Sequence, residues 1–134
     1  MKKTILFLFA AALMSAAILT SCWDVVLPEK VVVVGMQEGT LLAGTTGTVT
    51  FEIITTDIDA SQEGTVQWYS DAAGANMAGN APSGVGTISI STGSANRTLT
   101  IAVGEPLKLV AGTYWFRVVI DNVESNVGNL VIRN

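Results

Sequence analysis

From residue 31 onward, apolar and polar residues alternate along the chain in short runs. Val49, Phe51 and Ile53 are separated by threonine and glutamate, and residues 97–103 repeat the pattern. Successive side chains of a β-strand point to opposite faces of a sheet, so this alternation predicts strands with one buried face and one wet face. The expected strands lie near residues 31–35, 40–43, 48–55, 65–70, 86–91, 97–103, 113–121 and 124–132.

Glycine-containing turn segments separate these runs. The pair Gly-Thr occurs six times, which suits turns that lead into extended segments. Asp121-Asn122 is expected to form a two-residue hairpin turn, because both residue types tolerate positive φ. Residues 71–85 form the longest stretch without a pattern and are expected to be a mobile loop. Many short strands and no helical period predict an all-β fold, an antiparallel β-sandwich of about seven or eight strands.

The first 21 residues differ from the rest. Lys2 and Lys3 precede an apolar stretch from Ile5 to Leu19, and small residues follow. This order is typical of a secretory signal, and the stretch is short for a membrane span. We therefore expect a helical signal peptide at residues 1–21, a tether at residues 22–30 and one domain at residues 31–134.

The end of this leader, Leu19-Thr20-Ser21-Cys22, resembles the lipobox of bacterial lipoproteins. The resemblance implies cleavage before Cys22, alkylation of its sulfur to a thioether that carries diacylglycerol, and acyl chains such as palmitate on the anchor. Two or more acyl chains anchor a protein stably. The implied location is the cell envelope, at the outer membrane on its periplasmic or surface face. The alternatives are an ordinary cleaved signal with a free thiol and a retained membrane anchor.

The composition of the chain excludes several kinds of binding and catalytic site. After the leader the chain has five basic residues, not clustered, against eleven acidic ones, which argues against nucleic-acid binding. The chain has no histidine, which excludes histidine bases and metal ligands, and Cys22 is its single cysteine, which excludes an internal disulfide. We expect no cofactor and no metal.

Two segments resemble immunoglobulin-like domains. Trp68 in Val-Gln-Trp-Tyr looks like their core tryptophan, and Ala-Gly-Thr-Tyr-Trp-Phe at residues 111–116 is similar to their tyrosine corner. The resemblance implies that the hydroxyl of Tyr114 bonds back to the backbone. Phe116, and Phe51 or Ile53, stand where antibody domains have their two cysteines. This departure rules out kinship with antibody domains but not the architecture.

Residues 31–58 resemble a Gly/Thr-rich repeat module of bacterial surface proteins. The shared features are the glycines at 35, 39, 44 and 47 and the Thr-Val-Thr-Phe run that follows them. Such modules serve as spacers or binding units and carry no catalytic residues. The resemblance therefore implies a non-enzymatic envelope interaction or structural module that binds a protein or a glycan.

The candidate binding residues are Tyr69, Trp115 and Arg117. If Trp68 and Tyr114 point into the core, these three side chains point outward from two neighbouring strands. Tyrosine, tryptophan and arginine are the residues most enriched at binding hot spots. The alternative is that a loop or a neighbouring strand covers them, or that they are scattered surface residues.

Two chemical alternatives remain. Asp57, Asp59 and Glu63 could hold calcium, although their spacing lacks the glycine and further carboxylates of a calcium loop. The chain could also be an envelope enzyme or an accessory subunit of one, with an acid/base pair drawn from three glutamates. These are Glu52, Glu105 and Glu124.

The valine run from Val31 to Val34 offers a third alternative. An unprotected edge strand of this kind could pair with another chain and assemble into a surface structure.

Overall fold

The computed structural model describes residues 29–35 and 38–134. The signal peptide, Cys22 and most of the tether lie outside these residues. The described part forms nine strands and one short 3₁₀ turn, η1. Their bounds are β1 (Val31–Val34), β2 (Glu38–Leu42), β3 (Thr48–Thr56), β4 (Gly64–Tyr69), β5 (Val85–Ile90), β6 (Asn96–Val103), η1 (Pro106–Lys108), β7 (Gly112–Ile120), β8 (Val123–Glu124) and β9 (Gly128–Arg133).

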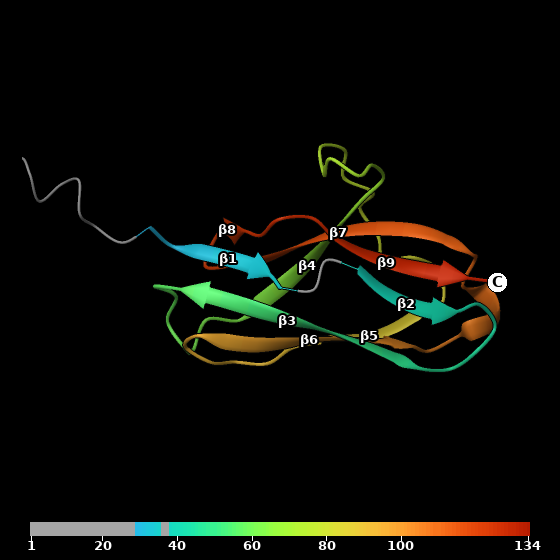
Figure 1. Cartoon of the computed structure of the whole chain (residues 1–134), viewed down its shortest axis with the longest axis horizontal. Coiled ribbons are helices and arrows are strands. Elements are labelled where there is room, and N and C mark those ends of the chain that lie inside the picture. Colours follow the sequence, from blue (N-terminus) through green and yellow to red (C-terminus); the bar gives the residue numbers. More distant parts are fainter. Residues whose placement is uncertain (1–28, 36–37) are drawn as a thin grey trace, which may run out of the picture.

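The strands form two sheets, which confirms the expected all-β sandwich (Figure 1). The first sheet has the order β1-β3-β6-β5, and all its pairings are antiparallel. The second sheet has the order β2-β9-β7-β4, with the short β8 pairing with β7. One pairing departs from the antiparallel expectation, because β2 runs parallel to β9. The segments 31–34 and 38–42, neighbours in sequence, therefore belong to different sheets.

The expected last strand, residues 124–132, is divided into β8 and β9. The interruption lies at Ser125, whose amide donates to the carbonyl of Val118 at 2.8 Å. The amide of Val118 donates not to a backbone carbonyl but to the Ser125 hydroxyl, at 2.9 Å. The β8–β9 side has one residue more than β7 between the pairs Val119–Glu124 and Phe116–Gly128. The extra residue makes a bulge and ends the first ladder.

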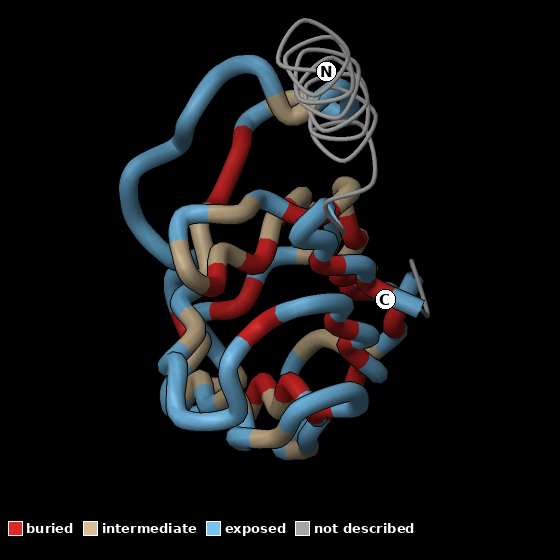
Figure 2. The backbone as a smooth tube through the Cα atoms, turned by 90° about the vertical axis from the view of Figure 1, so that its left-hand side faces the viewer, coloured by how far each residue is buried: buried red, intermediate tan, exposed pale blue. Residues whose placement is uncertain are grey.

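The core lies between the two sheets, and the alternation of the sequence decides which side chains enter it. In β3 every second residue is buried, and Figure 2 shows the same change between buried and exposed positions along other strands. Phe51 of the first sheet meets Phe116 of the second edge to face, with ring centroids 5.0 Å apart. Trp68 lies 5.6 Å from Phe116. These three rings hold the sheets together at the centre.

The hairpin turn at Asp121 and Asn122 is confirmed. Both residues have positive φ, 52° and 60°, and Ile120 pairs with Val123 across the turn. Aspartate and asparagine tolerate this left-handed conformation better than most residues. The turn projects Asp121 from the end of the sandwich at which β1 begins.

Candidate functional site

The three candidate binding residues lie together on the outer face of the second sheet. Strands β4 and β7 are neighbours, and Tyr69 pairs directly with Trp115. Arg117, two residues further along β7, pairs with Gln67. Because the intervening residues Trp68 and Phe116 point into the core, these side chains point away from it.

The expectation that Tyr69 is exposed is wrong, since only 7% of its surface is accessible. The chain that follows β4 folds back along it. The amide of Ser70 donates to the carbonyl of Asn76 at 2.9 Å, and the amide of Ala78 donates to the carbonyl of Trp68 at 2.8 Å. Tyr69 itself forms a bridge with Met77. These contacts pair residues 76–78 with the edge of β4, beside the buried Tyr69.

Arg117 is occupied by contacts within the domain. Its guanidinium donates to the carbonyl of Ser125 at 2.8 Å and to that of Ala73 at 3.2 Å. The same group lies 5.7 Å from the centroid of the Tyr69 ring, within cation–π range. Arg117 therefore joins β7 to the β8–β9 connection and to the β4–β5 loop.

Asp71 organises the start of this loop. Its carboxylate accepts a hydrogen bond from the amide of Asn76 at 2.7 Å and one from the amide of Ala75 at 3.2 Å. These backbone hydrogen bonds lower the pKa of Asp71, because they favour its charged form. The stretch that the sequence left without a pattern thus carries a defined set of local bonds.

Trp115 is a partly exposed candidate residue, as Arg117 is. It is half-buried, with Tyr69 on one flank and Asn129 of β9 on the other. Glu38 of β2 continues this row beyond Asn129, and its carboxylate lies 3.8 Å from the guanidinium of Arg133. The next row contains further residues of β7, β9 and β2. We call the combined surface the Trp115 face, which comprises Trp115, Asn129, Glu38, Thr113, Val131 and Thr40.

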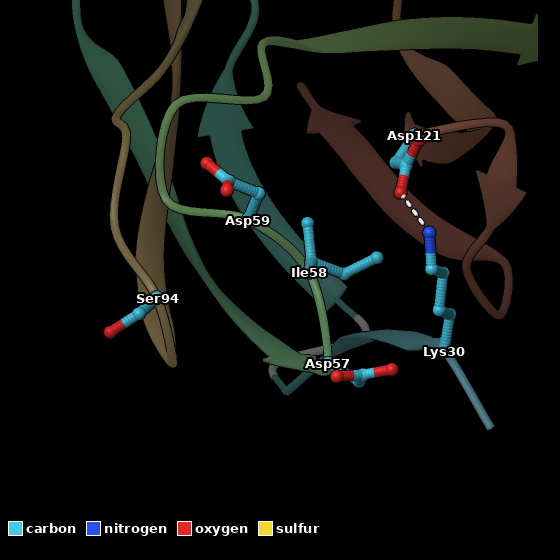
Figure 3. Close-up of a pocket in the computed structure, with 6 residues that line it drawn as sticks. All are labelled: Lys30, Asp57, Ile58, Asp59, Ser94 and Asp121. Carbon is cyan, nitrogen blue, oxygen red and sulfur yellow. Dashed lines mark hydrogen bonds and ion pairs between the residues drawn. The ribbon is translucent and has the colours of Figure 1, made fainter. Parts of the chain in front are cut away.

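A shallow pocket of about 420 Å³ lies at the end of the sandwich where β1 begins (Figure 3). Lys30 and Asp121 lie together on one side of it, with 2.6 Å between the ammonium and the carboxylate. This hydrogen bond and the charge of Asp121 raise the pKa of Lys30. The pocket is open and charged, and its lining consists of Lys30, Asp57, Ile58, Asp59, Ser94 and Asp121.

The acidic residues considered for calcium are not brought together. Asp57 and Asp59 line the pocket but Glu63 does not. Asp59 accepts hydrogen bonds from the hydroxyl of Ser61 at 2.6 Å and from its amide at 2.8 Å, which lowers the pKa of Asp59. Among residues 29–35 and 38–134, no group of three or more histidine, cysteine, aspartate or glutamate side chains is placed to hold a metal ion.

The three glutamates of the enzyme hypothesis are also separated. Glu52 is exposed on the outer face of the first sheet, opposite Thr98. Glu105 pairs with Lys108 beside η1, and Glu124 lies in the β7–β8 hairpin. The structure places these carboxylates on three different elements.

Arg97 is the important residue that the sequence did not single out. Only 2% of its surface is accessible, and its guanidinium donates to the carbonyls of Gly93 at 3.0 Å and Asp59 at 2.9 Å. It also donates to the carbonyl of Gln62. Arg97 thereby links the β3–β4 loop to the β5–β6 turn. The sequence did contain a signal for this burial, because Arg97 lies two residues before the inward-pointing Leu99 and therefore belongs to the same face of the strand.

The valine run β1 is an edge strand, as expected, but it is not fully unprotected. The side-chain amide of Asn126 receives a hydrogen bond from the amide of Val34 at 2.7 Å and donates to the carbonyl of Val34 at 3.3 Å. The outward-facing side chains Val31 and Val33 remain about one-third exposed, at 36% and 37%. Asn126 thus occupies the free backbone groups at the Val34 end of this edge.

No helix among the described residues is long and apolar enough to cross a membrane. Comparison with known proteins gives no assignment, since neither a protein-family model nor a curated protein sequence matches the chain.

Proposed function

We propose that this protein is a lipid-anchored module of the bacterial cell envelope, with an immunoglobulin-like sandwich that binds a protein or a glycan without catalysing a reaction. The anchor is Cys22, at the end of a leader that resembles a lipobox. The binding surface is the Trp115 face.

The strand order supports the immunoglobulin-like type. In such domains one sheet contains strands A, B, E and D and the other contains C, F and G. Here β1, β3, β6 and β5 correspond to the first set, and β4, β7 and β9 to the second. The hydroxyl of Tyr114 donates to the carbonyl of Val110 at 2.7 Å, as a tyrosine corner does. The Phe51–Phe116 contact occupies the place of the inter-sheet disulfide.

The partial exposure of Trp115 on the outer face of the second sheet is the observation that carries the binding proposal. Its ring is held on a sheet between the paired residues Tyr69 and Asn129, so binding would require little ordering of the backbone. The neighbouring amide of Asn129 and carboxylate of Glu38 supply acceptors and donors beside an apolar surface. A flat aromatic ring flanked by such groups suits the apolar face of a sugar or a side chain of a protein partner.

The binding proposal is tested with Trp115→Ala and with Thr98→Ala, which changes the outer face of the opposite sheet. Each protein is displayed on beads and exposed to solubilised envelope proteins and to an array of envelope glycans. We expect the Trp115→Ala variant to lose at least one partner that the wild type and Thr98→Ala retain. Identical sets of partners for all three proteins would refute the role of this face.

The anchoring proposal has a separate test. Mass spectrometry of the mature protein should show an N-terminal Cys22 carrying acyl chains, and Cys22→Ser should move the protein from the membrane fraction to the soluble fraction. An unmodified Cys22, or a leader that is still attached, would refute the lipid anchor whatever the Trp115 face binds.

A further inference from the structure

The two ends of the domain are connected by strands that lie lengthwise. In Figure 1, β1 begins at one end of the long axis and β9 finishes at the other. Strand β2, which follows β1, runs parallel to β9 through five pairs, from Glu38–Asn129 to Leu42–Arg133. The amide of Ala43 extends this ladder by donating to the carbonyl of Arg133 at 2.7 Å. A pull on the tether and an opposite pull on β9 would therefore act along the strands.

The direction of a pull decides how a ladder resists it. The hydrogen bonds of an antiparallel ladder are perpendicular to its strands, and those of a parallel ladder cross between the strands at a slant. A lengthwise force consequently strains the bonds of a ladder together, whereas a crosswise force breaks them one after another from an end. Strands β1 and β2 are each held by one such ladder, because β1 pairs with β3 over four residues in the first sheet and β2 pairs with β9 in the second.

Strand β1 is also fastened on its free side. Asn126, in the β8–β9 connection, bonds both polar backbone groups of Val34. Lys30, at the start of β1, forms its ion pair with Asp121 of the β7–β8 turn. The side chains of Val32 and Val34 are buried in the core. The strand nearest the tether is thus attached to both sheets.

We propose that the sandwich is a load-bearing coupling, which transmits force between the tether and a ligand held on the second sheet. This inference rests on the proposed function, in which Cys22 is anchored and the Trp115 face binds a partner. That face spans β7, β9 and β2. Force applied there passes through the parallel β2–β9 ladder into β2, and from β2 through β1 to the tether.

Single-molecule force spectroscopy tests the coupling on the full chain, produced with Cys22 unacylated. In the lengthwise geometry, one handle is attached to the Cys22 thiol and the other to a tag after Asn134. In the crosswise geometry, the second handle is attached to a thiol introduced by Thr92→Cys. Thr92 is exposed and close to Ser94, which lines the pocket beside Lys30, so both handles then pull from the same end.

We expect the unfolding force to be severalfold higher in the lengthwise geometry at the same loading rate. Equal forces, or a lower lengthwise force, would overturn the proposal. No partner takes part in this measurement, so its result is independent of whether Trp115→Ala loses a ligand.

Single substitutions test whether the side-chain bonds of β1 carry the load. Asn126→Ala should lower the lengthwise unfolding force, whereas Asn80→Ala in the exposed β4–β5 loop should leave it unchanged. If Asn126→Ala does not fold, Lys30→Ala removes the other fastening and should lower the force as well. Equal forces for the wild type and the folded variant would show that the side-chain bonds of β1 carry no load.

Discussion

Replacing Phe116 by leucine should test whether the contact between aromatic rings holds the two sheets together. Phe116 is fully buried and contacts Phe51 at 5.0 Å and Trp68 at 5.6 Å between ring centroids. Aromatic pairs contribute about 0.5–1.5 kcal/mol each beyond their buried area. Leucine preserves most of the apolar burial but loses both pairs, so we expect the free energy of unfolding to fall by roughly 1–3 kcal/mol.

The assay is equilibrium unfolding in urea, in a double-mutant cycle with Phe51→Leu. The two substitutions should be coupled by about 1 kcal/mol, because each removes the same ring contact. Val103→Ala provides the matched control. Val103 lies four residues along β6 from Leu99, the partner of Phe51, which is a distance of about 13 Å. A Phe51–Phe116 coupling no larger than the Val103–Phe116 coupling would refute the specific role of the ring pair.

Three further predictions concern other residues. Arg97→Met should lower the free energy of unfolding by about 2–4 kcal/mol in urea, because three carbonyl groups lose a charged donor; a loss below about 0.5 kcal/mol, as for ordinary surface changes, would contradict its buried role. Gly128→Ala should cost about 1–3 kcal/mol, since a Cβ atom there would lie 2.6 Å from the ring of Phe116, and an unchanged melting temperature would disprove this overpacking. The lowered pKa of Asp71 means that its bond to the Asn76 amide is present above the ordinary value of 3.8 and is lost as the pH falls through the lowered pKa; hydrogen exchange of that amide should accelerate in this acidic range, and exchange that Asp71→Ala leaves unchanged at neutral pH would contradict the assignment.

The strand positions were predictable because burial follows period two along most strands. In β3 and β6 the inward residues are those that the alternation indicates, with Phe51 and Leu99 among them. The turn at Asp121 and Asn122 was predictable from the tolerance of these residue types for positive φ. The hydrogen bond of Tyr114 followed from a resemblance, and the structure confirms the bond itself.

The burial of Tyr69 was not predictable in the same way. The fold-back of the β4–β5 loop depends on the bonds that Asp71 makes to backbone amides, and such bonds leave no periodic pattern. Alternation correctly gives the face to which Tyr69 belongs, but it carries no information about what lies above that face. The same limit applies to Arg97. The alternation indicated that its side chain points inward, but its three hydrogen-bond acceptors are backbone carbonyls, and every residue carries such a group.

The pairing of β2 with β9 also has a consequence for how the domain forms. Strand β2 is among the first to leave the ribosome and β9 is the last described strand, yet they are direct neighbours in the second sheet. Closing so long a loop costs entropy before any contact repays it, and topologies dominated by such distant contacts fold in milliseconds to seconds. The second sheet therefore cannot be completed before residue 133 has emerged from the ribosome, and β2 remains without its β9 partner until then.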